Sequence, residues 1–361
     1  MKYAVAVIII LSLFLQNCQV NKVTVDPIVG IKLYELQSDY NQLINEWKAI
    51  GINASYVSIA LAYDNKFRDL AKENNIDVYV IIPIFYNPEV LSDRPEWYGI
   101  KEDGGITKEE WVEFINPANL DYRAQRIQYI QKVVEDTKPT GISIDFIRYF
   151  SFWEKIYANR TLETISNSSF DSLSLSIFQK KNNIVIPNNL TEVTKQSKWI
   201  LENHKAAWTK WKCDNINTMV EQIVTVAKRS QPDLLTNLHV VPWRENDFNG
   251  AGQHILGQDL GRLAGLVDYI SPMCYSHMLK RDAPWVGAVI SDFSRQTNGA
   301  SILPSIQVKE AYLTNKLSPS EFKNNLMAAL LPPSKGVIFW SWPHFQIDKD
   351  KKMIVKKVVI D

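Results

Sequence analysis

The sequence predicts an α/β fold, a (β/α)8 TIM barrel with a helical insertion after strand four. Apolar, β-branched segments alternate with amphipathic ones at intervals of roughly 25 to 30 residues, which is typical of parallel strands joined by helices. Eight apolar segments follow one another between residues 28 and 341, the number of strands in such a barrel. Polar and aromatic residues gather where several of these segments end, and barrel enzymes carry their active sites at that end of the strands.

The first four strands are expected at 28–35, 54–61, 78–84 and within 141–150. The third is nearly all apolar, so we expect it to be buried on both faces. The other four strands are expected at 235–241, 266–274, 302–307 and 336–341.

Helices are expected between the strands, with the long ones at 39–50, 67–74, 121–136 and 203–229. Helix 203–229 carries apolar residues at three- and four-residue spacing, which predicts a face packed against the core. Ser318, Pro319 and Glu321 combine an N-cap, a proline at the first helical position and an acidic third residue, so a helix begins there and runs to Leu330.

Two segments interrupt this alternation. Residues 88–119 form a long loop rich in Pro, Gly, Trp and charged residues, and long loops after barrel strands usually have a function. Within it, Thr107 and Glu110 have the spacing of a capping box, which predicts a short helix. Residues 151–200 contain turn signals between apolar, helix-like pieces and form the start of the predicted insertion.

The composition excludes some classes of function. The 361 residues are 46% hydrophobic and 22% charged, and the net charge of +1 argues against nucleic-acid binding. Eleven Trp and 15 Tyr mildly favour a carbohydrate ligand, because flat rings stack on sugars. The three cysteines have no metal-ligand spacing, so neither a metal site nor a disulfide framework is expected.

The first residues resemble a targeting segment. Residues 1–18 read as a signal peptide, with Lys2 ahead of an apolar run that is too short to span a bilayer comfortably. The run ends at Cys18 in a loose bacterial lipobox, which predicts lipidation of that cysteine and export to the cell envelope. Residues 19–27 then form a tether, and residues 28–361 form one catalytic domain.

The stretch from Gly141 to Phe150 is the expected centre of the chemistry. A β-branched strand ends there in Asp145, followed by Arg148 and Tyr149. A carboxylate at the carboxyl end of a barrel strand is a candidate catalyst. The alternative is an aspartate that caps the next turn or pairs with Arg148.

Several motifs together resemble one family. Residues 140–149 (TGISIDFIRY) are similar to the strand-four signature of the glycosyl-hydrolase-like "family ten" proteins, although Thr140 and Phe150 depart from it. Residues 114–123 resemble the family's entry to the preceding helix, and residues 268–275 its sixth strand. Phe170 to Phe178, Pro187 and residues 208–212 resemble its insertion after strand four.

This resemblance implies a (β/α)8 barrel acting on glycans, with relatives in bacterial envelopes that cut peptide-free peptidoglycan strands. Asp145, Arg148 and Tyr149 match the family's aspartate, arginine and tyrosine. The stretch is also similar to strand four of chitinases, but Ile147 stands where those enzymes carry their acidic glutamate, which argues against chitinase chemistry.

Glycoside hydrolysis normally needs two carboxyl groups. We expect Asp145 to be the first, held ionised by Arg148, and Glu245 beyond strand five to be the second. Glu310, Asp247 and Glu35 are weaker candidates for the partner. In a further alternative, Asp145 is the acid and an acetamido group of the substrate is the nucleophile.

Aromatic and polar residues near strand ends are candidates for substrate binding. Besides Arg148 and Tyr149 they are Trp243, Tyr275, His277, Glu310, Trp340 and Trp342. No cofactor is expected, because the sequence contains no phosphate loop, dinucleotide fingerprint or nucleophile elbow.

These observations predict a secreted, lipid-anchored glycoside hydrolase. Its partners are a polysaccharide substrate and, through the anchor only, the membrane. The alternative is a catalytically inactive, glycan-binding surface lipoprotein on the same barrel, and a third option is a polysaccharide deacetylase or lyase.

Overall fold

The computed structural model describes residues 27–360, and the predicted signal segment and nearly all of the tether lie outside this range. Eight parallel strands form the central sheet in the order β8-β7-β6-β3-β2-β1-β10-β9. Their bounds are β1 Ile28–Leu33, β2 Ala54–Val57, β3 Asp77–Pro83, β6 Gly141–Asp145, β7 Leu235–Val240, β8 Tyr269–Pro272, β9 Ser305–Gln307 and β10 Gly336–Trp340.

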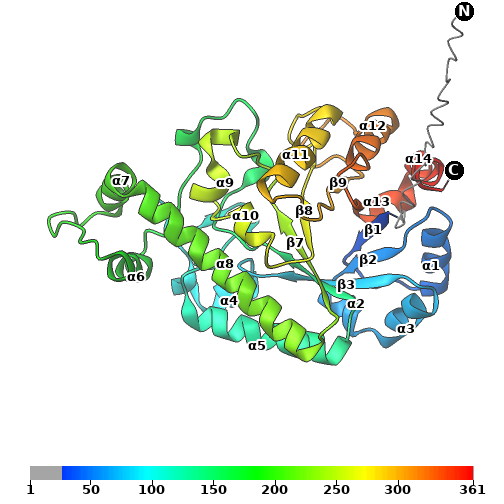
Figure 1. Cartoon of the computed structure of the whole chain (residues 1–361), viewed down its shortest axis with the longest axis horizontal. Coiled ribbons are helices and arrows are strands. Elements are labelled where there is room, and N and C mark those ends of the chain that lie inside the picture. Colours follow the sequence, from blue (N-terminus) through cyan, green and yellow to red (C-terminus); the bar gives the residue numbers. More distant parts are fainter. Residues whose placement is uncertain (1–26, 361) are drawn as a thin grey trace, which may run out of the picture.

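Isolated bridges connect the two edges of this sheet. Ile270 in β8 pairs with Ile302, and Met273 just beyond β8 pairs with Ser305 in β9. The strands therefore run around a barrel, with helices between them (Figure 1). The predicted (β/α)8 fold is confirmed.

Helices follow the strands because the sequence supplies caps and buried faces. Asp39 caps α1 (Tyr40–Lys48), Asn119 caps α5 (Leu120–Thr137) and Ser318 caps α12 (Pro319–Ala329), each side chain accepting a backbone N–H bond. The other helices of the barrel are α2 Ile59–Tyr63, α3 Asn65–Glu73, α4 Pro88–Asp93, α9 Ala251–His254, α10 Leu260–Leu263, α11 Ala283–Gln296, α13 Trp342–Ile347 and α14 Lys349–Val359.

The insertion after strand four consists of α6 (Ser172–Asn182), α7 (Val193–Asn203) and the first turns of α8 (Lys205–Ser230). It has a small core of its own, in which Trp208 stacks on Phe170 with ring centroids 4.9 Å apart. The rest of α8 packs against the barrel, so one helix joins the two parts, with α6 and α7 at its far end (Figure 1). The predicted helical insertion and its long helix are confirmed.

Two predicted elements are wrong. Residues 58–61 do not extend strand two, because the Ser58 hydroxyl accepts a hydrogen bond from the backbone N–H of Leu61 and starts α2. Thr107 does not cap a helix either. Its hydroxyl accepts from Gly99 and donates to the carbonyl of Phe114, and the following residues form a hairpin of β4 (Lys108–Glu109) and β5 (Val112–Glu113).

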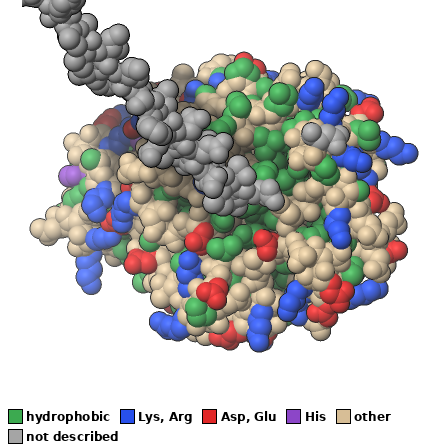
Figure 2. Space-filling model, turned by 45° about the vertical axis from the view of Figure 1, so that its right-hand side comes forward, with side chains coloured by type: hydrophobic (Ala, Val, Ile, Leu, Met, Phe, Trp, Pro, Cys, Tyr) green, Lys and Arg blue, Asp and Glu red, His purple; other side chains and the backbone are tan. Residues whose placement is uncertain are grey.

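Acidic and basic side chains are interspersed over the face shown in Figure 2. Within residues 27–360, none of the helices combines the length and the apolar character needed to cross a bilayer.

Candidate active site

A cavity of about 220 Å³ opens at the carboxyl ends of the barrel strands. Its lining comes from β1, β6 and β10, from the loops after β1, β6, β8 and β9, and from the β4–β5 hairpin. The lining residues are Lys32, Tyr34, Trp111, Asp145, Phe146, Arg148, Trp153, Glu154, Met273, Tyr275, Tyr312 and Trp340.

Asp145 is the last residue of β6 and lies at the cavity with 7% of its surface exposed. Strand β6 is fixed between β3 and β7. The carboxylate accepts a hydrogen bond of 2.7 Å from the backbone N–H of Phe146, which has a left-handed φ of 52°. This sharp turn leaves Asp145 at the strand end while the chain continues around the cavity.

Glu154 is a second carboxyl group in the same cavity, and sequence reasoning missed it. It lies in the 3-10 turn η2 (Trp153–Lys155) and is 8% exposed. Among the residues that the structure describes, its buried Oε2 atom has no hydrogen-bond partner. Burial raises the pKa of Glu154 to about 7; Arg148 opposes this rise and Asp145 adds to it. A large fraction of Glu154 is therefore protonated at neutral pH.

Arg148 lines the same cavity as the two carboxyl groups. Its Nη1 donates hydrogen bonds of 2.9 Å to the carbonyl of Ser151 and 3.2 Å to that of Tyr149, and its guanidinium lies 4.5 Å from the ring centroid of Phe114. Burial lowers the pKa of Arg148 to about 10, against the attraction of Glu154 and Asp145, so it remains a cation. The described side chains show no direct ion pair between Arg148 and either carboxylate, so its effect on them is through space.

A second buried cation, Lys32 in β1, lies at the cavity and was also missed. Its Nζ donates a weak hydrogen bond of 3.5 Å to the hydroxyl of Tyr275. Burial lowers the pKa of Lys32 to about 8, and the charge of Asp145 limits the decrease. The signal in the sequence is a lysine between two apolar residues of a predicted strand that is otherwise apolar.

Aromatic rings form the walls of the cavity. Tyr275 stacks on Trp340 with centroids 4.7 Å apart and an angle of 24°, and Trp153 lies 6.0 Å from Tyr275. Trp111 and Tyr312 are half-exposed at the rim. Flat apolar faces beside carboxyl groups are suited to a sugar ring, whose C–H faces stack on aromatics while its hydroxyls reach polar atoms.

Comparison with solved structures identifies this architecture. The PgaB (BpsB) glycoside hydrolase domain from Bordetella bronchiseptica superposes with a TM-score of 0.69 at 11% identity, covering 93% of this chain and 99% of that one. A β-galactosidase from Marinomonas ef1 gives a TM-score of 0.64 at 11% identity, covering 92% of this chain and 59% of that one. An α-L-fucosidase from Paenibacillus thiaminolyticus gives 0.58 at 12% identity, covering 92% and 49%.

The chain shares the (β/α)8 barrel fold of these glycoside hydrolases. At these identities the likeness concerns the fold. No protein-family model matches the sequence, and no curated protein matches it either. The resemblance to the "family ten" proteins therefore stays a prediction.

The barrel does not bring Glu245, the predicted second carboxylate, to Asp145. The Glu245 side chain is 52% exposed and forms an ion pair of 2.8 Å with Arg295. It lines a separate depression beyond β7, together with Trp243. The weaker candidate Asp247 is held by Arg244, at 2.9 Å. The strand-end rule placed these residues on the correct rim, but their loop turns them away from the centre.

The other predicted site residues divide into three groups. Arg148, Tyr275 and Trp340 line the cavity. Trp342 and Tyr149 are buried in the core instead, the tyrosine hydroxyl accepting a 2.9 Å bond from Asn215.

The third group contains the predicted binding residues His277 and Glu310 and the carboxylate candidate Glu35, which are committed to other contacts or to solvent. His277 is buried between Glu321, at 2.8 Å, and the carbonyl of Asn315. Glu310 accepts a hydrogen bond from the backbone of Leu317, and Glu35 is exposed. None of them lines the Asp145 cavity. Cys18 lies outside the described residues.

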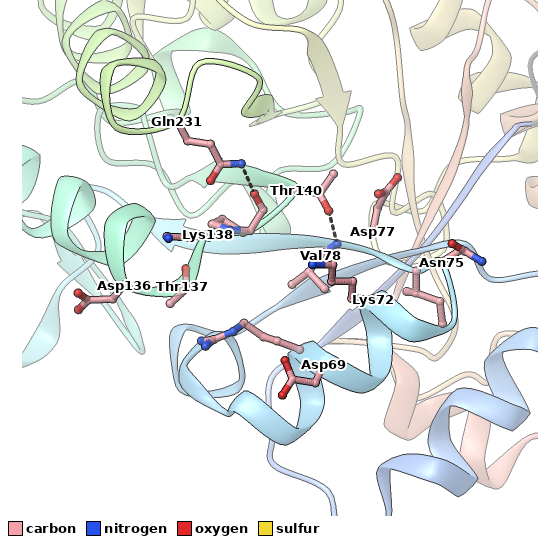
Figure 3. Close-up of a pocket in the computed structure, with 13 residues that line it drawn as sticks. Asp69, Lys72, Asn75, Asp77, Val78, Asp136, Thr137, Lys138, Thr140 and Gln231 are labelled. Carbon is pink, nitrogen blue, oxygen red and sulfur yellow. Dashed lines mark hydrogen bonds between the residues drawn. The ribbon is translucent and has the colours of Figure 1, made fainter.

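A larger depression of about 600 Å³ lies at the opposite end of the barrel (Figure 3). Asp77, the first residue of β3, and Thr140, just before β6, contribute to it, whereas Asp145 ends β6. The Thr140 hydroxyl accepts a 3.1 Å hydrogen bond from the backbone N–H of Val78. The polar groups of this depression therefore join strands at their amino ends. Barrel enzymes do not carry their chemistry at that end.

Proposed function

We propose that this protein is a glycoside hydrolase that cleaves O-glycosidic bonds of a polysaccharide, with Asp145 and Glu154 as its two carboxyl groups. The observation that carries the proposal is that both line one buried cavity at the catalytic end of the barrel. The fold shared with solved glycoside hydrolases supports the same reading.

The environments of the two carboxyl groups suggest that they have different roles in the reaction. Glu154, with a pKa raised to about 7, carries the proton that is transferred to the glycosidic oxygen as the bond from the anomeric carbon to that oxygen breaks. Asp145, near the cations Lys32 and Arg148, supplies negative charge opposite the developing oxocarbenium ion, as nucleophile or as the base that activates water. A water molecule supplies the hydroxyl of the released sugar.

The alternative of an inactive glycan-binding barrel rested on the departures at Thr140 and Phe150 and on the lack of an obvious second acid. Glu154 removes the second of these reasons, because it is buried, acidic and in the cavity of Asp145. We therefore keep hydrolysis as the proposal and treat binding without turnover as an outcome of its test.

The test is release of reducing ends from peptidoglycan, chitin, galactosaminoglycan and plant and host glycans, with Asp145→Asn beside the wild type. Wild-type protein is expected to release reducing ends from at least one glycan, and the variant to lose this activity while it keeps its melting temperature and glycan binding. Full activity in Asp145→Asn would refute the assignment. Glycan binding without release by the wild type would support the inactive barrel.

We also propose that the chain is exported and anchored to the bacterial envelope through lipidated Cys18. The support is the sequence of residues 1–18. Labelling of cells with a clickable palmitate analogue is expected to mark the wild type and not Cys18→Ala. Equal labelling of both would contradict lipidation at this cysteine.

A further inference from the structure

A hydrogen bond spans the mouth of the cavity. The indole Nε1 of Trp111 donates to the hydroxyl of Tyr312 at 2.7 Å. Trp111 is at the turn of the β4–β5 hairpin that follows β3, and Tyr312 is in the loop after β9. In the strand order, β9 is four strands from β3, which is half of an eight-stranded ring. The bond therefore joins loops from opposite sides of the barrel.

A third loop supports this bridge. Lys155, next to Glu154, forms an ion pair with Glu110 of the hairpin, and its ammonium lies 5.5 Å from the ring centroid of Tyr312. Phe152 packs edge-on against Tyr312 with centroids 5.6 Å apart. Because three loops hold the two rings together, the bridge is a built part of the cavity wall.

The space that the bridge leaves is small. The cavity of about 220 Å³ is below the roughly 300–1,000 Å³ of common ligand pockets. Both bridge residues line this cavity and are also 40–41% exposed, so they form the rim between it and solvent. A polysaccharide that lies across the mouth would have to pass through the space that they occupy.

We propose that the Trp111–Tyr312 bridge restricts the site to chain ends, so that the enzyme removes single sugar units from the non-reducing end of its glycan. This inference rests on the proposed function. The sugar that reacts has its anomeric carbon at the two carboxyl groups and its leaving group toward solvent. Its other end then faces the Trp111–Tyr312 bridge, beyond which no further sugar unit fits. Only a terminal, unsubstituted unit meets that condition.

The experiment uses reducing-end-labelled oligosaccharides of the glycan that the wild type cleaves, in a free form and in a form blocked at the non-reducing end by a 4,6-O-benzylidene group. The wild type is expected to shorten the free form one unit at a time and to cleave the blocked form at least tenfold more slowly. A Trp111→Ala/Tyr312→Ala double variant is expected to reduce that ratio at least fivefold. Tyr63→Phe removes another half-exposed tyrosine hydroxyl, bonded to Asp136, and is expected to change nothing.

Internal cleavage by the wild type, or equal rates on both forms, would overturn the proposal. Binding to Asp145→Asn gives a second readout, in which the blocked oligosaccharide is expected to bind at least tenfold more weakly than the free one. Equal binding of the two would also overturn it. Failure of the proposed function is a different result, namely no release of reducing ends from any glycan.

Discussion

Glu154 shares a buried cavity with Asp145, and within residues 27–360 its Oε2 atom has no hydrogen-bond partner. A buried polar atom without a partner is costly. Glu154 lines the cavity in which a substrate would lie beside Asp145. We interpret its carboxyl group as the one that donates the proton in the glycosidic reaction.

Replacing Glu154 by Gln is expected to lower kcat/KM for a natural glycan by roughly 100- to 10,000-fold, the contribution typical of general acid catalysis. A 2,4-dinitrophenyl glycoside should lose far less activity, because its leaving group departs without a proton. The measurement is the ratio of the two losses. Equal losses with both substrates would contradict the role of an acid.

The pH profile tests the same assignment. Because the acid acts in its protonated form, and burial raises the pKa of Glu154 to about 7, wild-type kcat/KM should fall as the pH rises through about 7. On the dinitrophenyl substrate this alkaline limb should be weak. An alkaline limb that persists unchanged in Glu154→Gln would assign it to another group.

Glu245→Gln is the matched control, since it makes the same chemical change at the carboxylate that the sequence favoured. Its side chain is exposed and paired with Arg295, outside the Asp145 cavity. We expect kcat/KM within about twofold of the wild type and no change in the pH profile. A loss as large as that of Glu154→Gln would restore the sequence-based pair.

The fold was predictable because its signals are local. Buried parallel strands such as β3 and β6 are short apolar runs, and the caps at Asn119 and Ser318 sit beside the helices that they start. One error arose where a side chain bonds to residues outside the local motif. The hydroxyl of Thr107 bonds to Gly99 and Phe114, and no spacing rule indicates that use.

The site residues were predictable only where the end of a strand determines the position of the side chain. Asp145 ends β6, so its place at the catalytic rim follows from the strand. Glu154 depends on the path of the loop, which begins with Phe146 in a left-handed conformation that the residue type does not indicate. Glu245 shows the converse, because a loop that starts at the correct rim turns its side chain outward to Arg295.

Lys32→Met is expected to stabilise the folded protein while it lowers activity. Burial lowers the pKa of Lys32 from 10.5 to about 8, which corresponds to a cost on the order of 3 kcal/mol for the charged form. That value already includes the attraction to Asp145. Thermal unfolding at pH 7 should therefore show a higher melting temperature, and kcat/KM should fall at least tenfold because a cation near Asp145 is lost.

The same shift in the pKa of Lys32 determines whether the stability of the folded protein rises or falls with pH. Between pH 8 and 10.5 the unfolded chain holds a proton on Lys32 that the folded chain has released, so wild-type stability rises with pH through this residue. The advantage of Lys32→Met should shrink over that range. Lys351→Met is the control, because this buried lysine donates a 2.8 Å hydrogen bond to the carbonyl of Val308 and pairs with Asp348. Its removal should destabilise the folded protein.

Trp340 and Trp342 are neighbours in sequence with different expected roles. Trp342 is fully buried against Trp47, with centroids 5.9 Å apart, so Trp342→Ala should cost about 3–5 kcal/mol in the free energy of unfolding. Trp340 is partly exposed in the cavity wall, where it stacks on Tyr275. Trp340→Ala should cost only about 1 kcal/mol, the loss of one aromatic pair.

The two substitutions should affect activity in the opposite order to stability, with the larger loss of activity in Trp340→Ala. Well below its unfolding transition, Trp342→Ala should keep kcat/KM within about threefold of the wild type, because its ring does not line the cavity. Trp340→Ala should lose at least tenfold, mainly through KM, because the substrate loses a stacking surface. Denaturant titration and steady-state kinetics on the same preparations measure both quantities. A Trp340→Ala variant with unchanged kinetics would remove this wall from the substrate site.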